Sequence, residues 1–144
     1  MRGFKFKFAK VLRVREIKED KALDHFRKSQ RRVRKVEAEL EKKENKRERI
    51  YNYIRSENDI SPDFMAVVRR YLKINRKKID ELKNRLTELR KELEEKKQEY
   101  LKRRRKREIM DRLKENALEK KQKEFLDREQ KELDEIGQLK REVQ

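Results

Sequence analysis

The one turn-rich segment of the chain reads Ser56-Glu57-Asn58-Asp59-Ile60-Ser61-Pro62-Asp63. Ser61 suits the position that caps a helix, because its hydroxyl can accept a hydrogen bond from a backbone N–H of the first turn. Pro62 then takes the first helical position, where its missing N–H costs nothing. The carboxylate of Asp63 interacts favourably with the positive end of the helix dipole. These residues predict that a helix begins at Pro62.

Downstream of this turn, apolar residues recur at alternating steps of three and four. Such spacing over several heptads, with charged residues on both flanks, is typical of a coiled coil. The series weakens around Arg103 and Arg107 and resumes in a shifted phase at Leu118, which predicts a stutter or a change of partner there. Its regular part comprises Val68, Leu72, Asn75, Ile79, Leu82, Leu86, Leu89, Leu93, Lys96 and Tyr100.

A second series precedes the turn. We call the positions of each helix that face the other helix its seam positions. In this series the apolar seam positions are Leu23, Phe26, Val33, Leu40, Tyr51 and Ile54, and Phe8 and Leu12 extend the series upstream. Polar residues interrupt it at Gln30, Glu37, Glu44 and Arg47. Each helix exposes an apolar stripe that a partner has to cover. A connector this short makes the other helix of the same chain that partner. The pattern therefore predicts an all-α fold, a long two-helix antiparallel coiled-coil hairpin.

The two predicted helices differ in length. We expect a single domain over residues 1–144, with a helix over about 5–55, a turn over about 56–61 and a helix over about 62–139. Counting outward from the turn places Phe26 near Leu93, so the second helix extends past the first as a C-terminal overhang. An unpaired amphipathic helix end is an interaction site. The apolar residues of this overhang are Leu118, Phe125, Leu126, Leu133 and Ile136.

The composition excludes most enzymes. Glycine and proline together number three, charged residues make up 53% of the chain and hydrophobic residues 33%, which is too little apolar mass to enclose a pocket. His25 is the only histidine and cysteine is absent, so we predict no catalytic residue, no metal site, no cofactor and no small-molecule substrate. The N-terminus lacks the apolar run of a secretory signal peptide, and no apolar segment is long enough to span a membrane.

The net charge of +17 favours an acidic partner. Six consecutive bases occupy 102–107, and further bases cluster over 27–35, so the two runs form a lengthwise basic stripe. A solvated face, an acidic protein partner, phosphate groups and a nuclear-type targeting tract all remain open for it. The absence of a recognised reading motif argues against nucleic acid. The run on the second helix includes Arg103, Arg104, Arg105 and Arg107.

Two further classes of protein compete with a stalk-like hairpin. A basic coiled coil that binds nucleic acid is supported by charge alone, and its binding would fade steeply with salt. A homo-oligomeric coiled-coil scaffold would give a dimer mass in light scattering. Because a hairpin closes its own seam, we expect a monomer instead.

Aromatic residues gather near the predicted tip of the hairpin. Tyr51 falls in the seam, whereas Tyr53 and Tyr71 lie off the seam positions and are expected to be exposed. They are either ordinary surface tyrosines or a docking patch.

Each end of the chain carries a distinctive block of residues. The N-terminal block has the pattern Phe-x-Phe-x-x-Val-Leu-x-Val-Arg-Glu and runs from Phe6 to Glu16, and the C-terminal block runs from Glu129 to Ile136. Both blocks resemble the terminal signatures of the family of the flagellar export protein FliJ. The length, the break near residue 58 and the basic charge agree with it. The corresponding stalk subunit of virulence-type secretion systems looks similar.

The resemblance implies a non-enzymatic component of the type III export apparatus, with an antiparallel coiled coil similar to the stalk subunit of rotary ATP synthases. It implies a cytoplasmic protein, peripheral at the cell membrane, that binds the hexameric export ATPase, contacts the membrane protein of the export gate and escorts export chaperones. Gate contacts carry over to Tyr53, Tyr71 and Asn75, and the basic stripe is expected to line a central pore of the ATPase. ATPase binding carries over to Phe6, Phe8, Leu12, Leu118, Phe125, Leu126, Leu133 and Ile136.

Overall fold

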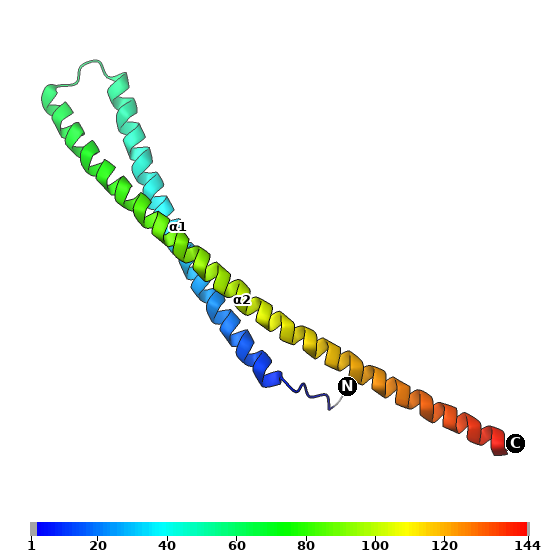
Figure 1. Ribbon diagram of the computed structural model, residues 1–144. Helices are drawn as coiled ribbons and strands as arrows, with labels where there is room; N and C mark the ends of the chain where they lie inside the picture. The colour runs from blue at the N-terminus through cyan, green and yellow to red at the C-terminus, as the bar shows by residue number, and fades with distance from the viewer. Residues whose placement is uncertain (1–2, 144) are drawn as a thin grey trace. The chain divides into compact units, whose positions relative to one another are not determined.

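The computed structural model describes residues 3–143, so the outermost residues of the predicted 1–144 domain lie outside it. It consists of two α-helices, α1 (Ala9–Ser56) and α2 (Pro62–Val143), which pack against each other in antiparallel directions (Figure 1). Residues 3–143 contain no β-strand. The predicted all-α hairpin is confirmed, and the single domain stays a prediction.

Two compact units make up the chain. The hairpin unit is Lys21–Tyr100, which contains the connector, and the terminal unit combines the described residues 3–20 and 101–143. Each helix contributes to both units, and each unit has its own part of the seam.

The connector caps α2 as its sequence predicts. The Phe64 N–H donates to Ser61 Oγ at 3.2 Å, and the Met65 N–H donates to the Ser61 carbonyl at 2.9 Å. α2 begins at Pro62 for this reason and continues to Val143, a few residues beyond the expected end.

The first helix begins later than expected, at Ala9 instead of near residue 5. Its first turn carries no acidic residue that would interact with the helix dipole. Gly3 lies in the left-handed region with a φ of 89°, and the Ala9 N–H donates to the Phe6 carbonyl in a turn before the helix.

The seam of the hairpin unit keeps the spacing of three and four on both helices. Val33, Val36 and Leu86 form its buried centre, and the half-buried leucines packed against them are Leu40, Leu82, Leu89 and Leu93. Ala22, Ser29, Asn75 and Ile79 are buried as well. Every apolar residue that the second-helix series predicts from Val68 to Leu93 is buried or half-buried.

Several first-helix assignments are wrong by one residue. Ser29 and Val36 occupy seam positions that the pattern gave to Gln30 and Glu37, because a small or β-branched residue fits a narrow seam better than a long polar one. Glu37 instead forms an ion pair with Arg90 at 3.3 Å beside the seam. Tyr51 is exposed and its neighbour Ile50 is half-buried.

The residues that contact each other across the seam differ from the pairs expected by counting outward from the turn. Phe26 stacks on Tyr100, with ring centroids 6.0 Å apart and planes inclined by 4°, instead of meeting Leu93. Helical side chains tilt toward the N-terminus of their own helix. In this hairpin the tilt points away from the turn on α1 and toward the turn on α2, so an α1 side chain meets an α2 residue that lies further from the turn than the one directly opposite its backbone.

In the terminal unit, arginines continue the seam. Across residues 100–110, all of which the structure describes, the spacing of three and four is unbroken, with Arg103 and Arg107 half-buried and Met110 buried. The seam therefore keeps its phase as far as Met110, and the stutter expected before Leu118 stays a prediction. Long arginine stems can cover apolar surface while their charged ends reach a partner, so a basic residue interrupts the apolar pattern without shifting the phase.

Candidate interaction surfaces

The N-terminal aromatic block folds onto α2 within the terminal unit. The Lys121 ammonium lies 5.6 Å from the centroid of the Phe4 ring, and the rings of Phe6 and Phe8 make an edge-to-face contact at 5.8 Å. Phe6 is half-buried and Phe8 is exposed. The block therefore forms a partly accessible aromatic surface next to the start of α1.

One of the predicted ATPase-binding residues, Leu12, belongs to the interior of this unit. Leu12 is buried, as is Met110 on α2, whereas Leu118 is half-buried. Leu12 therefore offers little surface to a partner.

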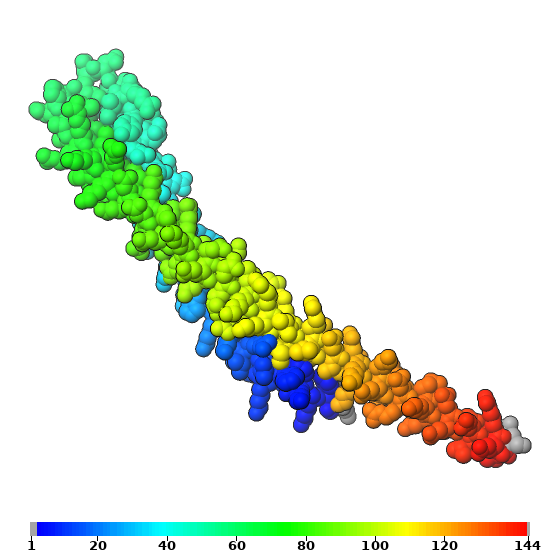
Figure 2. Space-filling model, in the orientation of Figure 1, coloured from blue at the N-terminus to red at the C-terminus, as the bar shows by residue number. Residues whose placement is uncertain are grey.

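The overhang consists of the part of α2 beyond Lys121. None of the described residues 3–20 lies beside it, and Figure 2 shows it without a second helix along its length. Its four predicted contact residues are 47–62% exposed, a range set by Phe125, Leu126, Leu133 and Ile136. Leu139 extends the same face and is exposed too. Leu139 follows Ile136 at the seam spacing but was not among the predicted contact residues.

Arg107 is held in a network that spans both helices of the terminal unit. Its guanidinium donates through Nε and Nη2 to the Glu19 carboxylate, with 3.0 Å from Nη2 to Oε1, and through Nη1 to Asp111 Oδ2 at 2.7 Å. Hydrogen bonding to Glu19, and then to Asp111, raises the pKa of Arg107 further above its already high usual value. The guanidinium of Arg107 is therefore occupied by contacts within the terminal unit.

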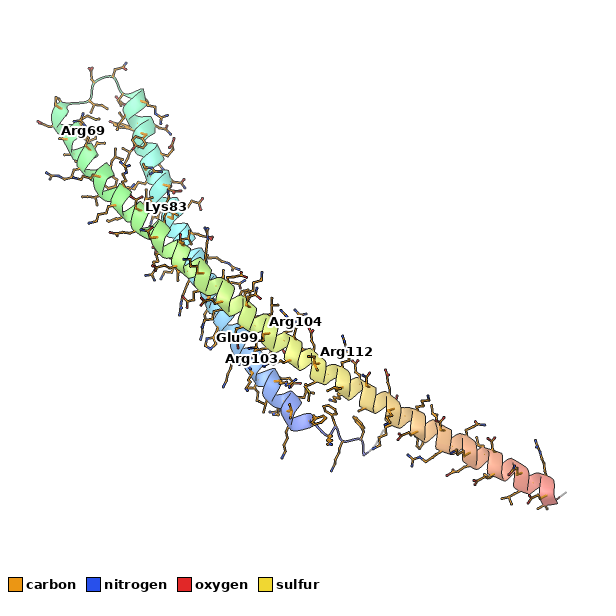
Figure 3. The ribbon with its side chains drawn as sticks, in the orientation of Figure 1. Arg69, Lys83, Glu99, Arg103, Arg104 and Arg112 are labelled. Carbon is orange, nitrogen blue, oxygen red and sulfur yellow. The ribbon has the colours of Figure 1, made fainter. Side chains whose placement is uncertain are left out.

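The other three arginines of the predicted stripe differ in their surroundings. Arg103 takes a half-buried seam position, whereas Arg104 leaves α2 in another direction (Figure 3) and pairs with Glu108 at 2.9 Å. Arg105 is exposed. Of the four predicted residues, Arg104 and Arg105 present their side chains to solvent, so a basic surface exists here but is narrower than the sequence suggests.

An apolar groove of about 470 Å³ lies on the hairpin unit close to the connector. Tyr53 packs edge-to-face on Phe64 with ring centroids 6.4 Å apart, and the Lys46 ammonium lies 5.0 Å from the centroid of the Tyr71 ring. The structure thus brings Tyr53 and Tyr71, from different helices, to one groove. The complete lining is Lys46, Arg49, Ile50, Tyr53, Phe64, Val67, Val68 and Tyr71.

Asn75 does not line that groove. Its side chain is 3% exposed and donates from Nδ2 to the Lys43 carbonyl at 3.3 Å across the seam. A buried amide with a fixed partner sets the register of a coiled coil. Asn75 is therefore positioned to align the helices beneath the groove.

Residues 3–143 offer no candidate for a metal site or a membrane span. No group of three or more histidine, cysteine, aspartate or glutamate side chains in this range could hold a metal ion. Neither helix, over the residues described, has an apolar segment long enough to cross a bilayer.

One comparison with known proteins gives a match. The family model described as "Flagellar FliJ protein" matches residues 4–141, a range that includes both terminal blocks, both helices and the connector. No curated protein and no solved structure matches the chain.

Proposed function

This chain belongs to the flagellar FliJ family and is a component of flagellar type III protein export, and from that premise we propose that it acts as a stalk-like coiled coil between the export ATPase and the export gate. In this role, the terminal unit binds the hexameric ATPase, and the groove near the connector binds the membrane protein of the gate. The flagellar family match favours this system over the virulence-type one.

The observation that carries the ATPase assignment is the exposed overhang. Phe125, Leu126, Leu133 and Ile136 form an apolar face on a helix that has no second helix of the described chain beside it. Covering such a face removes apolar surface from water, which contributes roughly 25 cal/mol per Å². Phe6 and Phe8 supply a second apolar element in the same unit.

The basic surface is proposed to add a contact of low specificity. Arg104 and Arg105 are exposed, and exposed cations attract an acidic channel over about one Debye length, roughly 8 Å at physiological salt. Arg107 is excluded from this role because Glu19 and Asp111 occupy its guanidinium.

The gate contact is proposed at the groove that contains Tyr53 and Tyr71. Aromatic side chains at the edge of an apolar groove supply contact area at low entropic cost, and such residues dominate binding energy at interfaces. Asn75 acts there indirectly, because its bond to the Lys43 carbonyl aligns the two helices that form the groove.

The same proposal includes escort of export chaperones and a cytoplasmic location, peripheral at the inner face of the cell membrane. It assigns no enzymatic activity to the chain. Nucleic acid is not proposed as a partner, because the charge of +17 is the only feature that would favour it.

The overhang assignment is tested by substituting alanine for Leu126 and Leu133 together. Both side chains are more than 60% exposed, so helicity measured by circular dichroism should match that of the parent. Binding to purified hexameric export ATPase should weaken by about tenfold or more, as expected when interface anchors are truncated.

The matched control is Ile74→Ala, which removes an exposed apolar side chain from α2 in the hairpin unit. It should leave ATPase binding unchanged. Unaltered binding by the double variant, or a loss of helicity, would show that these leucines are not the anchor.

A further inference from the structure

The two sides of the coiled coil differ in how their residues are placed relative to the seam. In the hairpin unit, Arg32 and Glu92 each immediately precede a seam position, and they pair across the helices at 3.4 Å. Glu37 and Arg90 each immediately follow a seam position, and they pair at 3.3 Å. Residues that precede seam positions on α1 and α2 therefore share one side, and residues that follow them share the other.

The same rule defines a surface on the terminal unit. At the spacing of three and four, its seam positions are Leu12, Arg15 and Glu19 on α1 and Arg103, Arg107, Met110 and Lys114 on α2. The residues that immediately precede these positions, here called the lateral patch, are all exposed. They are Val11, Val14 and Lys18 on α1 and Lys102, Lys106, Ile109 and Leu113 on α2.

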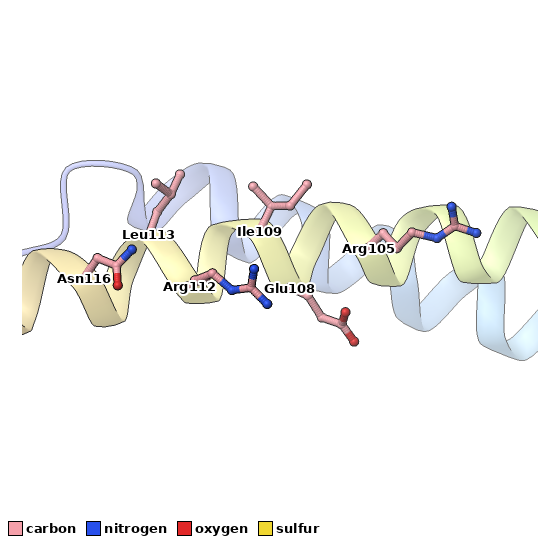
Figure 4. Close-up of a pocket in the computed structure, with 6 residues that line it drawn as sticks. All are labelled: Arg105, Glu108, Ile109, Arg112, Leu113 and Asn116. Carbon is pink, nitrogen blue, oxygen red and sulfur yellow. The ribbon is translucent and has the colours of Figure 1, made fainter.

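The lateral patch combines aliphatic side chains with lysines. Its four aliphatic members are 41–58% exposed. Figure 4 shows Ile109 and Leu113 projecting from one edge of α2, whereas Glu108 projects from the other. Along α1 the aliphatic pair lies between Lys10 and Lys18, and along α2 it lies between Lys106 and Lys114. The apolar part of the patch is therefore bounded by lysines at both ends.

The acidic residues of the same segments lie on the opposite side of the unit. Each of them immediately follows a seam position, apart from Glu19, which occupies the seam itself. They are Glu16, Asp20, Glu108, Asp111 and Glu115. Because charge is sorted between the two sides, the lateral patch presents positive charge without a neighbouring acid.

A basic hollow adjoins the lateral patch at the start of α1. It has a volume of about 730 Å³, and Val11 of the patch lines it together with Lys5, Lys7, Lys10 and Lys114. Its remaining lining residues are aromatic or apolar, and none is acidic. The positively charged, partly apolar surface therefore continues from α1 and α2 onto the N-terminal block.

We propose that the lateral patch docks on the surface of a bilayer that contains anionic lipids. Charge complementarity carries this assignment, because lysines attract anionic headgroups within about one Debye length, roughly 8 Å at physiological salt. The aliphatic side chains then enter the boundary between headgroups and acyl chains. The long stems of the lysines let their ammonium groups stay at the level of the phosphates.

An acidic protein and a nucleic acid fit the lateral patch less well. Directed recognition of carboxylates favours the forked guanidinium of arginine, whereas every cation of the patch is a lysine. A nucleic acid would bring its phosphates to the lysines but leave the aliphatic side chains in water. A bilayer surface uses both parts of the patch.

The overhang takes no part in this contact. At 3.6 residues per turn, its exposed apolar residues point on average to the opposite side of α2 from Ile109 and Leu113. α2 is one continuous helix from Pro62 to Val143, so a bilayer on the lateral patch leaves the apolar face of the overhang open to a different partner.

This contact goes beyond the export role proposed above. The peripheral location in that role requires only a contact with the gate, whereas the lateral patch adds direct contact with lipid. The patch shares no residue with the groove or the overhang, and its test uses only this protein and lipid vesicles. A failure of lipid binding and a failure of ATPase or gate binding are therefore separate results.

The test is co-sedimentation of the full-length protein with lipid vesicles at about 100 mM salt. Vesicles of phosphatidylcholine with about 30% phosphatidylglycerol should bind the protein about tenfold or more tightly than vesicles of phosphatidylcholine alone, because only the former carry negative charge. Equal affinity for the two kinds of vesicle, or no binding to either, would overturn the proposal.

A neutral substitution tests the apolar part of the patch. Ile109→Gln with Leu113→Gln keeps the net charge and should weaken binding to the anionic vesicles by about tenfold or more, because the aliphatic side chains no longer enter the bilayer. Ile74→Gln removes an equally exposed isoleucine from α2 in the hairpin unit and is the matched control. It should bind like the parent, and circular dichroism checks that each variant stays helical. Parental binding by the double variant would show a purely electrostatic attraction and reject the bilayer as the specific occupant.

A second variant tests the lysines of the patch. Lys18→Gln, Lys102→Gln and Lys106→Gln together should weaken binding to the anionic vesicles by about tenfold or more. The matched control removes the same charge from exposed lysines of the hairpin unit, through Lys42→Gln, Lys73→Gln and Lys77→Gln.

The control should lose clearly less affinity than the patch variant. Equal losses would show that net charge alone holds the protein on the vesicles and that the lateral patch is not the docking surface. If the parent binds neither kind of vesicle while the patch variants lose ATPase binding, the occupant of the patch is the ATPase and the proposal is wrong.

Discussion

Arg107 and Glu19 form a charged pair in the seam of the terminal unit, where both are half-buried. Removing an ion from water costs free energy, which a partner must offset through hydrogen bonds of good geometry. Here the guanidinium makes two bonds to Glu19 and one to Asp111. The pair therefore specifies which residues face each other in the terminal unit.

We predict that Glu19→Gln destabilises the protein by about 1 kcal/mol, because Arg107 keeps Asp111 but loses the ionised partner on the facing helix while staying half-buried. Thermal unfolding followed by circular dichroism should show a midpoint lower by about 2–4 °C. The control is Asp24→Asn, which breaks the exposed pair with Lys28. Hydrogen bonding to Lys28 lowers the pKa of Asp24, but solvent screens this pair. Equal shifts for the two variants would contradict a special role for Glu19.

Single residues were the least predictable level of the structure. Ser29 and Asn75 are polar and buried, so a search for apolar residues passes over Ser29 in favour of its neighbours. Asn75 was placed correctly in the seam, but its bond to the Lys43 carbonyl depends on the facing backbone. Such a partner lies 32 residues away and leaves no local signal.

Among the elements, α2 has the better defined start. Ser61, Pro62 and Asp63 act together there, and the hydroxyl of Ser61 accepts a hydrogen bond from the Phe64 N–H. α1 has no comparable signal, and it begins at Ala9 after a turn closed by the Phe6 carbonyl. The element with the cap was predicted to the residue, whereas the other was misplaced by several positions.

We predict that Ser61→Ala lowers the free energy of unfolding by about 1 kcal/mol, the usual cost of losing a side-chain cap. Chemical denaturation should show a lower midpoint with an unchanged slope. Ser56→Ala is the matched control: its hydroxyl donates to the Tyr53 carbonyl at the end of α1, where solvent readily replaces it. A larger effect at Ser56 would contradict the importance of the cap.

For the molecule as a whole, the candidate contacts fall on surfaces that belong to different units. The groove with Tyr53 and Tyr71 lies in the hairpin unit, and the overhang lies in the terminal unit. Substitutions in one unit are therefore expected to leave binding at the other intact.

Replacing Tyr53 and Tyr71 together with alanine should weaken binding to the cytoplasmic part of the export-gate protein by about tenfold, since aromatic anchors dominate interface energy. Calorimetric titration measures the affinity, and binding to the ATPase should stay at the parental level. Tyr51→Ala is the control, because Tyr51 is exposed but lies outside the groove. Loss of both interactions in the double variant would indicate a general defect.

At this scale, the sequence predicted the hairpin, the overhang and the family, because each depends on periodicity or on terminal blocks that can be read locally. It did not predict that Ile109 and Leu113 are exposed on α2. Ile109 and Leu113 look like misplaced members of a weakening seam until Met110 is known to be the buried residue, since a shift of one position decides which side a helical residue faces.

Because the seam of the hairpin unit keeps its spacing without a break, the length of this unit can change only in fixed steps. Removing seven residues from each helix at facing positions would keep every remaining seam residue in phase and shorten the unit by about 10 Å. Insertions of the same size would lengthen it by an equal step. The length of the hairpin unit can therefore change in steps of seven residues without a change in the groove or in the cap of α2. A step of any other size would rotate the apolar face of one helix away from the other helix.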